Sequence, residues 1–173
     1  MKVTNRRRST LWLIVFAVAV LAAVTVAGIL LNGQAMESDF ARKNLMPCLE
    51  YPFGTDWMGR DMLARTLAGL SLSIRIGLLT AAVSACIALV MGIVSAAMGR
   101  WADSVVCFCI DLVMGIPHIL LVMLISIACG KGFLGVVTGV ALSHWTSLAR
   151  VIRGEVMQLR QAPYILAAQK LGV

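Results

Sequence analysis

Long blocks of apolar residues constrain this chain more than any other feature of its sequence. The first block, residues 11–31, contains no charged side chain, and a helix needs about 20 such residues to cross the hydrocarbon core of a membrane. Charged residues make up 13% of the chain and hydrophobic ones 60%, whereas a soluble domain has about 25% charged residues. The sequence therefore predicts an all-α membrane protein.

Three further apolar blocks follow the first, so the sequence predicts four membrane-spanning helices. They are expected at residues 11–31, 71–98, 104–129 and 133–149. The first block could instead be a cleaved signal peptide, but the apolar core of a signal peptide is only about 7–15 residues long. We therefore expect it to stay in the membrane.

Basic residues lie at the ends of the apolar blocks, where they orient membrane proteins. The cluster Arg6-Arg7-Arg8 precedes the first helix, which places residues 1–10 in the cytoplasm by the positive-inside rule. Alternation then puts residues 32–70 outside and residues 150–173 inside. Scattered charges of this kind are not typical of nucleic-acid binding, which needs many phosphate contacts.

Small residues recur at four-residue spacing within two of the predicted helices. They are Ser84, Ala88, Gly92 and Ala96 in the second helix, and Gly135 and Gly139 in the fourth. Such spacing lets helices approach closely in lipid, although chance in an Ala- and Gly-rich chain is the alternative. We expect a packed bundle.

Few residues suggest chemistry within the apolar blocks. Asp111, followed by Pro117, is an intramembrane carboxylate and thus a functional candidate, which we expect to face the bundle interior as a hydrogen-bond partner or a substrate contact. Pro117 should kink its helix. His118 and His144 are interpreted as structural, because no cluster with ligand spacing accompanies them and no metal site is expected. The five cysteines are interpreted as packing residues, without disulfides.

The external segment contains a dense motif just before the second membrane helix. In residues 53–65, Thr55 or Asp56 can cap an amphipathic helix that begins at Trp57, and Asp61 can pair with Arg65 four residues later. We expect this helix to lie along the outer membrane surface.

This motif resembles that of the dipeptide, oligopeptide and nickel permeases of ABC importers. Its matching residues are Gly54, Thr55, Asp56, Gly59, Arg60, Asp61 and Arg65. The family commonly has an Arg three residues before the intramembrane Asp, and Phe108 stands there in this chain. The resemblance therefore implies that an ion pair of the family is missing.

The C-terminal segment contains the second resemblance. Pro163 can open a helix, Tyr164, Ala167, Ala168 and Leu171 would share one face, and Gly172 can end it in a left-handed conformation. The residues Ala167, Ala168 and Gly172 are similar to the coupling motif of ABC importer permeases, with Leu166 in place of the family's Glu. The run from Trp145 to Arg153 also looks like this family.

The resemblance implies a type I ABC importer transmembrane fold, with about four of six expected helices. Tyr164, Ala167, Ala168 and Gly172 would dock an ATP-binding subunit, and the family's remaining helices would follow Gly172, so the sequence is expected to be a fragment. Residues 71–173 would form part of the transmembrane domain, in the cytoplasmic membrane of a bacterium or archaeon.

The chain has no P-loop, so it is not expected to be an enzyme, and ATP and Mg²⁺ would be bound by partner subunits. The resemblance implies two such ATPases, a second homologous permease, an extracytoplasmic binding protein and surrounding lipid. The substrate would be a peptide or nickel, or alternatively another small solute or metal chelate. A stand-alone channel, an anchor or a membrane enzyme is the competing hypothesis.

Overall fold

Helices make up nearly all of the regular structure in this chain. The computed structural model describes residues 6–172, without the side chains of Arg6, Leu166, Ala168 and Gln169. Two compact units, residues 1–77 and 78–173, divide the chain within α3 (Met62–Ala97). Among the described residues there is no strand, only an isolated bridge between Thr55 and Asp61, which confirms the all-α prediction.

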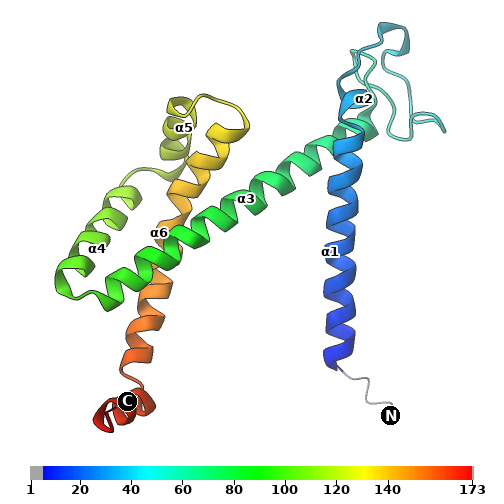
Figure 1. The fold of residues 1–173 in the computed structure, drawn as a ribbon. Helices are drawn as coiled ribbons and strands as arrows, with labels where there is room; N and C mark the ends of the chain where they lie inside the picture. Colours follow the sequence, from blue (N-terminus) through cyan, green and yellow to red (C-terminus); the bar gives the residue numbers. More distant parts are fainter. Residues whose placement is uncertain (1–5, 173) are drawn as a thin grey trace. The chain divides into compact units, whose positions relative to one another are not determined.

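The first unit contains one apolar helix and a folded connector, residues 31–61, which leads to α3. The helix α1 (Arg6–Leu30) is followed by α2 (Asn32–Met36), the 3₁₀ helix η1 (Phe40–Arg42) and the beginning of α3 (Figure 1). A Cβ added to Gly28 would lie 2.2 Å from the carbonyl oxygen of Leu67, and the Ser71 hydroxyl donates a hydrogen bond of 3.0 Å to the carbonyl of Thr25. The end of α1 therefore packs closely on the beginning of α3.

The second membrane helix begins differently from the prediction. We expected an amphipathic surface helix starting at Trp57 and then a separate span from residue 71, but α3 is one helix of 36 residues that starts at Met62. Gly59 has a φ of +76°, which keeps the preceding residues in a turn. The Asp61 carboxylate accepts a hydrogen bond of 2.8 Å from the Leu63 amide, so Asp61 caps the helix instead of Thr55 or Asp56.

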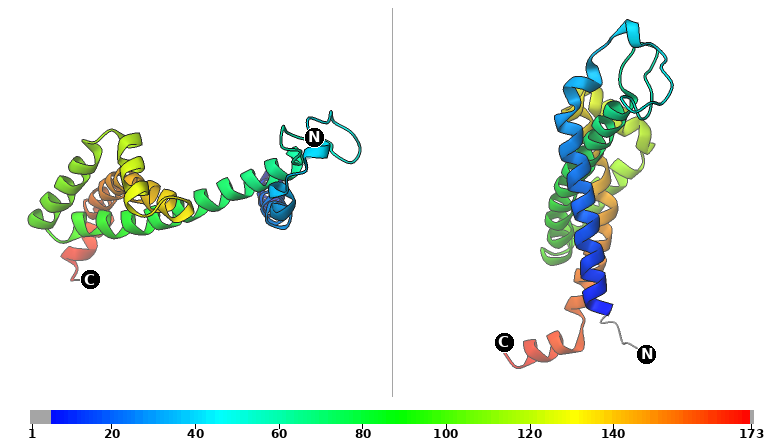
Figure 2. Two further views of the ribbon diagram at one scale, coloured as in Figure 1. Left: turned by 90° about the horizontal axis from the view of Figure 1, so that it is seen from above. Right: turned by 90° about the vertical axis from the view of Figure 1, so that its right-hand side faces the viewer.

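The second unit is built around α6 (Phe133–Arg160). The helices α4 (Arg100–Met114) and α5 (His118–Ala128) and the C-terminal part of α3 surround α6, and α7 (Pro163–Lys170) follows it (Figure 2). Over residues 135–145 of α6, buried residues alternate with half-buried or exposed ones. The buried residues of the helix are Gly135, Val137, Gly139, Ala141, Ser143, Trp145, Thr146 and Ala149. This pattern shows that α6 is covered from more than one side.

The small residues of α3 face α6, which confirms the predicted close packing. Ala88 is fully buried, and the Ser84 hydroxyl donates a hydrogen bond of 3.0 Å to the carbonyl of Ala141. At Gly92 an added Cβ would lie 2.8 Å from Cγ2 of Ile152. Since lipid gives helices little hydrophobic reason to associate, this close approach is the main source of their contact energy.

The glycines of α6 pack on α5 in the same way. Added Cβ atoms would lie 2.6 Å from the carbonyl oxygen of Ser126 at Gly135, and 2.8 Å from that of Val122 at Gly139. Any side chain would push the two helices apart. Small residues therefore hold α6 against α5 as well as against α3.

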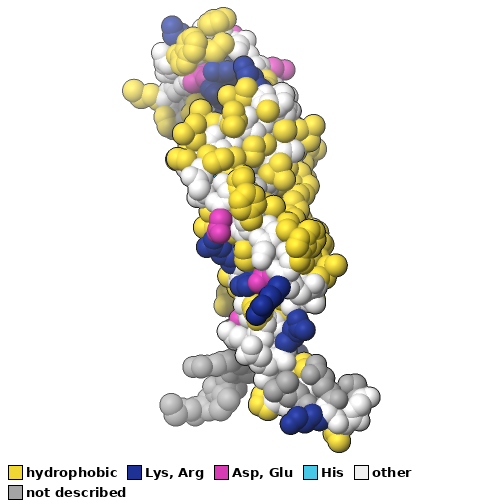
Figure 3. All heavy atoms as spheres, turned by 90° about the vertical axis from the view of Figure 1, so that its left-hand side faces the viewer, with side chains coloured by type: hydrophobic (Ala, Val, Ile, Leu, Met, Phe, Trp, Pro, Cys, Tyr) yellow, Lys and Arg dark blue, Asp and Glu magenta, His cyan; other side chains and the backbone are white. Residues whose placement is uncertain are grey.

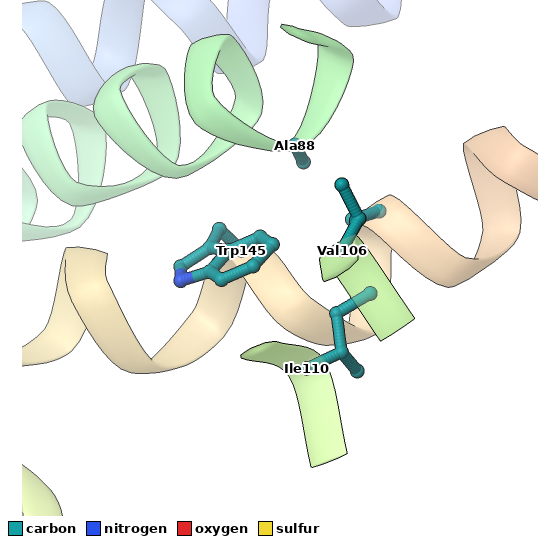
Figure 4. Packing of buried hydrophobic residues seen from close by; sticks show 5 residues of the cluster. Ala88, Val106, Ile110 and Trp145 are labelled. Carbon is teal, nitrogen blue, oxygen red and sulfur yellow. The ribbon is translucent and has the colours of Figure 1, made fainter. Parts of the chain in front are cut away.

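One aromatic side chain fills the centre of the second unit. Trp145 of α6 lies among Ala88 of α3 and Val106 and Ile110 of α4 (Figure 4), and it is 6% exposed. Ala149 completes this cluster. The cluster joins three helices in one core.

The third predicted span is broken, which corrects the expectation of one helix over residues 104–129. The helices α4 and α5 meet at a bend of 94°, with Pro117 just before α5. Proline lacks the amide hydrogen that would continue the helix, so the predicted kink becomes a full break. By length and apolar composition, two described helices, α1 and α3, can cross a membrane, or three spans if the bent pair counts as one.

The fourth predicted helix is longer than expected. We expected it to end at residue 149, before a separate surface segment, but α6 continues to Arg160. Arg153 and Arg160, in its last turns, form hydrogen bonds with residues of α3 and α4. These bonds allow the helix to extend past the apolar block. Whether α6 itself crosses the membrane stays a prediction.

The close approach at Gly92 leads to a stability prediction. Gly92→Val should lower the free energy of unfolding of the detergent-solubilised protein by about 1–3 kcal/mol, because the new side chain would overlap Ile152. Gly69→Val is the matched control, since a Cβ added at Gly69 of α3 meets nothing within 4 Å. Thermal unfolding measures both variants, and equal stability of the two would contradict the packing described.

Candidate functional site

Charged side chains gather around the second half of α6, next to the helix that follows it. Figure 3 shows hydrophobic side chains over the middle of the face that carries α4, and Lys and Arg side chains below them toward the C-terminal end. Arg150, Arg153 and Arg160 fall within an arc of about 80° on α6 at 100° per residue. One side of this helix therefore presents a row of arginines.

Arg153 is the centre of this row. Its Nε and Nη2 atoms donate hydrogen bonds of 2.5 and 2.6 Å to the two carboxylate oxygens of Asp103 on α4. The Nε atom also lies 3.1 Å from Oγ of Ser95 on α3, and that hydroxyl donates to Asp103. A bidentate pair of this kind is stronger and more directional than a single contact, and here it joins three helices.

The other two arginines contact the same helices. Arg160 donates a hydrogen bond to the carbonyl oxygen of Ala96, at the end of α3. Arg150 lies 2.5 Å from the carboxylate of Asp111 on α4. Sequence reasoning did not single out Asp103, Arg153 or Arg160 as a group, although the spacing of the arginines on one helical face was a usable signal.

Asp111 lies differently from the expectation. Its side chain is 67% exposed, so it does not face the interior of this bundle as predicted. Arg150 supplies Asp111 with a cationic partner. Phe108 occupies the position at which the resembled family commonly has an Arg. Since Arg150 is half exposed as well, this pair contributes little stability in water.

The predicted C-terminal helix is present as α7. It begins at Pro163 and ends before Gly172, whose φ is +78°, as the sequence predicted. Tyr164 is 64% exposed, and Ala167 and Gly172 are exposed as well, whereas the side chain of Ala168 lies outside the described residues. The helix therefore offers a largely uncharged surface.

A cavity of about 450 Å³ lies at the break between α4 and α5. It is lined by Pro117 and His118 on one side and by the hydroxyl residues Ser143, Thr146 and Ser147 of α6 on the other. The ring of His118 meets that of His144 edge to face, with 4.7 Å between the centroids. No group of three metal-ligating residues occurs in the part of the chain described, and all five cysteines are thiols.

The motif of residues 54–65, which leads into α3, supports the fold of the connector. Gly54 and Gly59 have positive φ angles, and a Cβ on Gly59 would overlap the carbonyl oxygen of Asp39. The Thr55 hydroxyl donates to the carbonyl of Arg42 and accepts from the Leu45 amide. These contacts fix a compact loop at the beginning of α3.

Asp56 is the electrostatic centre of this loop. Its carboxylate accepts hydrogen bonds of 2.9 Å from the amides of Met58 and Arg60 and from Nε of Arg60, and it also pairs with Arg65. Arg65 therefore pairs with Asp56 and not with Asp61 as predicted. Desolvation raises the pKa of Asp56, but the hydrogen bonds from Arg60 and Met58 outweigh it and lower the pKa to about 2.

The chain is similar in sequence to known membrane components of transport systems. Residues 88–173 match the family described as "Binding-protein-dependent transport system inner membrane component". The oligopeptide transport system permease protein OppC of Bacillus subtilis is 32% identical over 78% of this chain and 46% of its own length. The dipeptide transport system permease protein DppC of the same organism is 29% identical over 91% of this chain and 49% of its own length.

A second DppC, from Lactococcus lactis, is 30% identical over 81% of this chain and 41% of its own length. The chain thus spans about half the length of the curated relatives it matches. The matched family region begins at Ala88 and so includes the row of arginines, the cavity and α7.

The depressed pKa of Asp56 predicts how the connector responds to acid. Because the folded pKa is about 2 and the ordinary value is 3.8, the carboxylate stabilises the loop above about pH 4 and loses this effect as the pH falls toward 2. Hydrogen exchange of residues 53–65, corrected for intrinsic rates, should lose protection in that window. In Asp56→Asn, the same residues should lack this protection from hydrogen exchange already at pH 7.

Glu37→Gln is the control for this experiment, since the Glu37 carboxylate makes no ion pair within the described part of the chain. It should exchange like the wild type at pH 7. Full protection of the loop in Asp56→Asn would show that the carboxylate does not hold it.

Proposed function

Because the chain belongs to the family of binding-protein-dependent transport system inner membrane components, we propose that it serves as a membrane-spanning permease subunit of an ATP-driven importer. It would form part of the path by which the importer moves peptides inward. Energy would come from a separate subunit that binds ATP and Mg²⁺, since this chain contains no P-loop.

The observation that carries this proposal is the placement of α7 relative to α6. The helix α7 lies directly after α6 and presents Tyr164, Ala167 and Gly172 to its surroundings. A short helix with small, uncharged residues on its surface fits a groove on another protein. We propose this surface as the docking site of the ATP-binding subunit.

The contacts of α6 support a cytoplasmic position for α7. Arg153 and Arg160, near the end of α6, bind Ser95 and the carbonyl of Ala96 near the end of α3, so the ends of these two helices lie at the same level. If α3 crosses the membrane once from an external connector, both ends face the cytoplasm, whatever path α4 and α5 take. The arginines at these ends agree with the positive-inside rule.

The cavity at the break of α4 is the part of this chain best suited to line the substrate path. Broken helices at membrane depth are tolerated where they line a cavity or are covered by protein. The exposed hydroxyl residue Ser147 would offer a polar contact to a peptide backbone, whereas the hydroxyls of Ser143 and Thr146 donate to carbonyls of α6 itself. A channel without an ATPase would not require α7, and that helix favours the importer.

The proposed assembly includes a second permease, two ATP-binding subunits and an extracytoplasmic binding protein. Only 6% of the most apolar window of α1 is buried within this chain, so the remaining surface is available to lipid or to a second permease. Relatives named for oligopeptide and dipeptide transport support a peptide as the substrate. Nickel stays a prediction of the sequence that no described metal cluster supports.

The docking proposal predicts the effect of a charge on α7. Ala167→Arg should reduce co-purification of the ATP-binding subunit by about tenfold or more, because an unpaired charge would be buried in the interface. Gln161→Arg adds the same charge two residues before α7 and should leave co-purification unchanged. Quantitative pull-down from membranes measures both, and wild-type recovery with Ala167→Arg would contradict docking through α7.

A further inference from the structure

The last two turns of α6 are bonded to two other helices immediately before α7 begins. Only Gln161 and Ala162 separate α6 from α7. Backbone hydrogen bonds continue through this corner, from Gln161 to Gln158, from Ala162 to Leu159 and from Ile165 to Ala162, at 3.0–3.1 Å. Because these bonds make the corner rigid, a displacement of α7 should displace the end of α6 as well.

The end of α6 is in turn fixed to the turn between α3 and α4. Arg153 forms two hydrogen bonds with Asp103 and one with Ser95, so one guanidinium holds a residue on each side of that turn. The side chains of Arg153 and Asp103 are 29% and 28% exposed, so most of the pair is shielded from water. Ion pairs shielded in this way are screened much less by salt than exposed ones.

Small residues alone would not hold α6 in one register on α3. Ala88 and Gly92 allow the two helices to approach closely, and single hydrogen bonds from Ser84 to Ala141 and from Arg160 to Ala96 also join them. A bidentate arginine–carboxylate pair has a fixed geometry. The pair thus adds a contact of fixed geometry between α6 and α4, and the hydrogen bond of Arg153 with Ser95 extends it to α3.

We propose that Asp103, Arg153 and Ser95 form a clamp through which movement of α7 reaches the turn between α3 and α4. This inference rests on the proposed docking of an ATPase on α7. Asp103 and Arg153 would act as positioning residues, through their contacts with other helices. The clamp makes α6, the turn and the end of α3 move as one body, so that work done on α7 alters the bundle around the cavity at Pro117.

The test uses a double-mutant cycle in the assembled importer. Asp103→Arg and Arg153→Asp each place two like charges face to face, and the double exchange restores an opposite pair. Arg100→Gln is the matched control, because Arg100 lies exposed at the first position of α4, directly after the same turn, and is not part of the clamp. Three quantities are measured for each variant: co-purification of the ATPase, ATP turnover, and peptide uptake into proteoliposomes.

We expect each single variant to keep the ATPase bound and to hydrolyse ATP, while peptide uptake falls by about tenfold. The double exchange should recover uptake to within about threefold of the wild type, and Arg100→Gln should transport normally. Wild-type uptake in either single variant would overturn the clamp. The clamp would also be overturned if the double exchange transported no better than the single variants. It would be overturned as well if the single variants lost the ATPase and the double exchange did not restore its binding.

Thermal unfolding of the purified chain separates this inference from the proposed function. The single exchanges should lower the melting temperature and the double exchange should restore it, whether or not an ATPase binds α7. Failure of wild-type protein to retain an ATPase would refute the docking proposal while leaving this result intact. Additive losses of stability in the double exchange would refute the clamp itself.

Discussion

The close contact of α6 with its neighbours is the interaction on which the rest of the second unit depends. In lipid, helices gain little from hydrophobic association and must rely on tight packing and a few polar bonds. Ala88 and Ala149 are both fully buried at this contact, and Gly92 leaves no space for a side chain. Because α3 and α6 approach so closely, Trp145 can reach α4, and Arg153 can reach Asp103 and Ser95.

The position of α6 in the bundle also explains how much of the fold could be predicted. The helical content and the contact face of α3 followed from apolar length and four-residue spacing, which are local properties of the sequence. The extension of α6 to Arg160 did not, because its arginines are satisfied by residues about 50 positions away in the chain, such as Asp103. The break at Pro117 was visible as a kink, but the angle of 94° depends on how α5 packs on Gly135 and Gly139.

The candidate site shows the same division. Pro163 and Gly172 mark the ends of α7 through their own backbone preferences, so the sequence was sufficient to predict that helix. The partners of charged residues depend on the tertiary fold: Arg65 pairs with Asp56 across the connector, and Asp111 pairs with Arg150 from another helix. The nearest suitable charge along a predicted helix was the wrong partner for Arg65, since Asp61 is used as a helix cap.

The side of the membrane on which α7 lies tests the account most directly. In a chain whose other cysteines are replaced, Cys48 in the exposed connector and a cysteine introduced by Tyr164→Cys would each be treated with a membrane-impermeant thiol reagent in intact cells. We predict that Cys48 is labelled in intact cells and that Tyr164→Cys is labelled only after permeabilisation. Labelling of Tyr164→Cys in intact cells would contradict an ATP-driven importer, since nucleotide is available only in the cytoplasm.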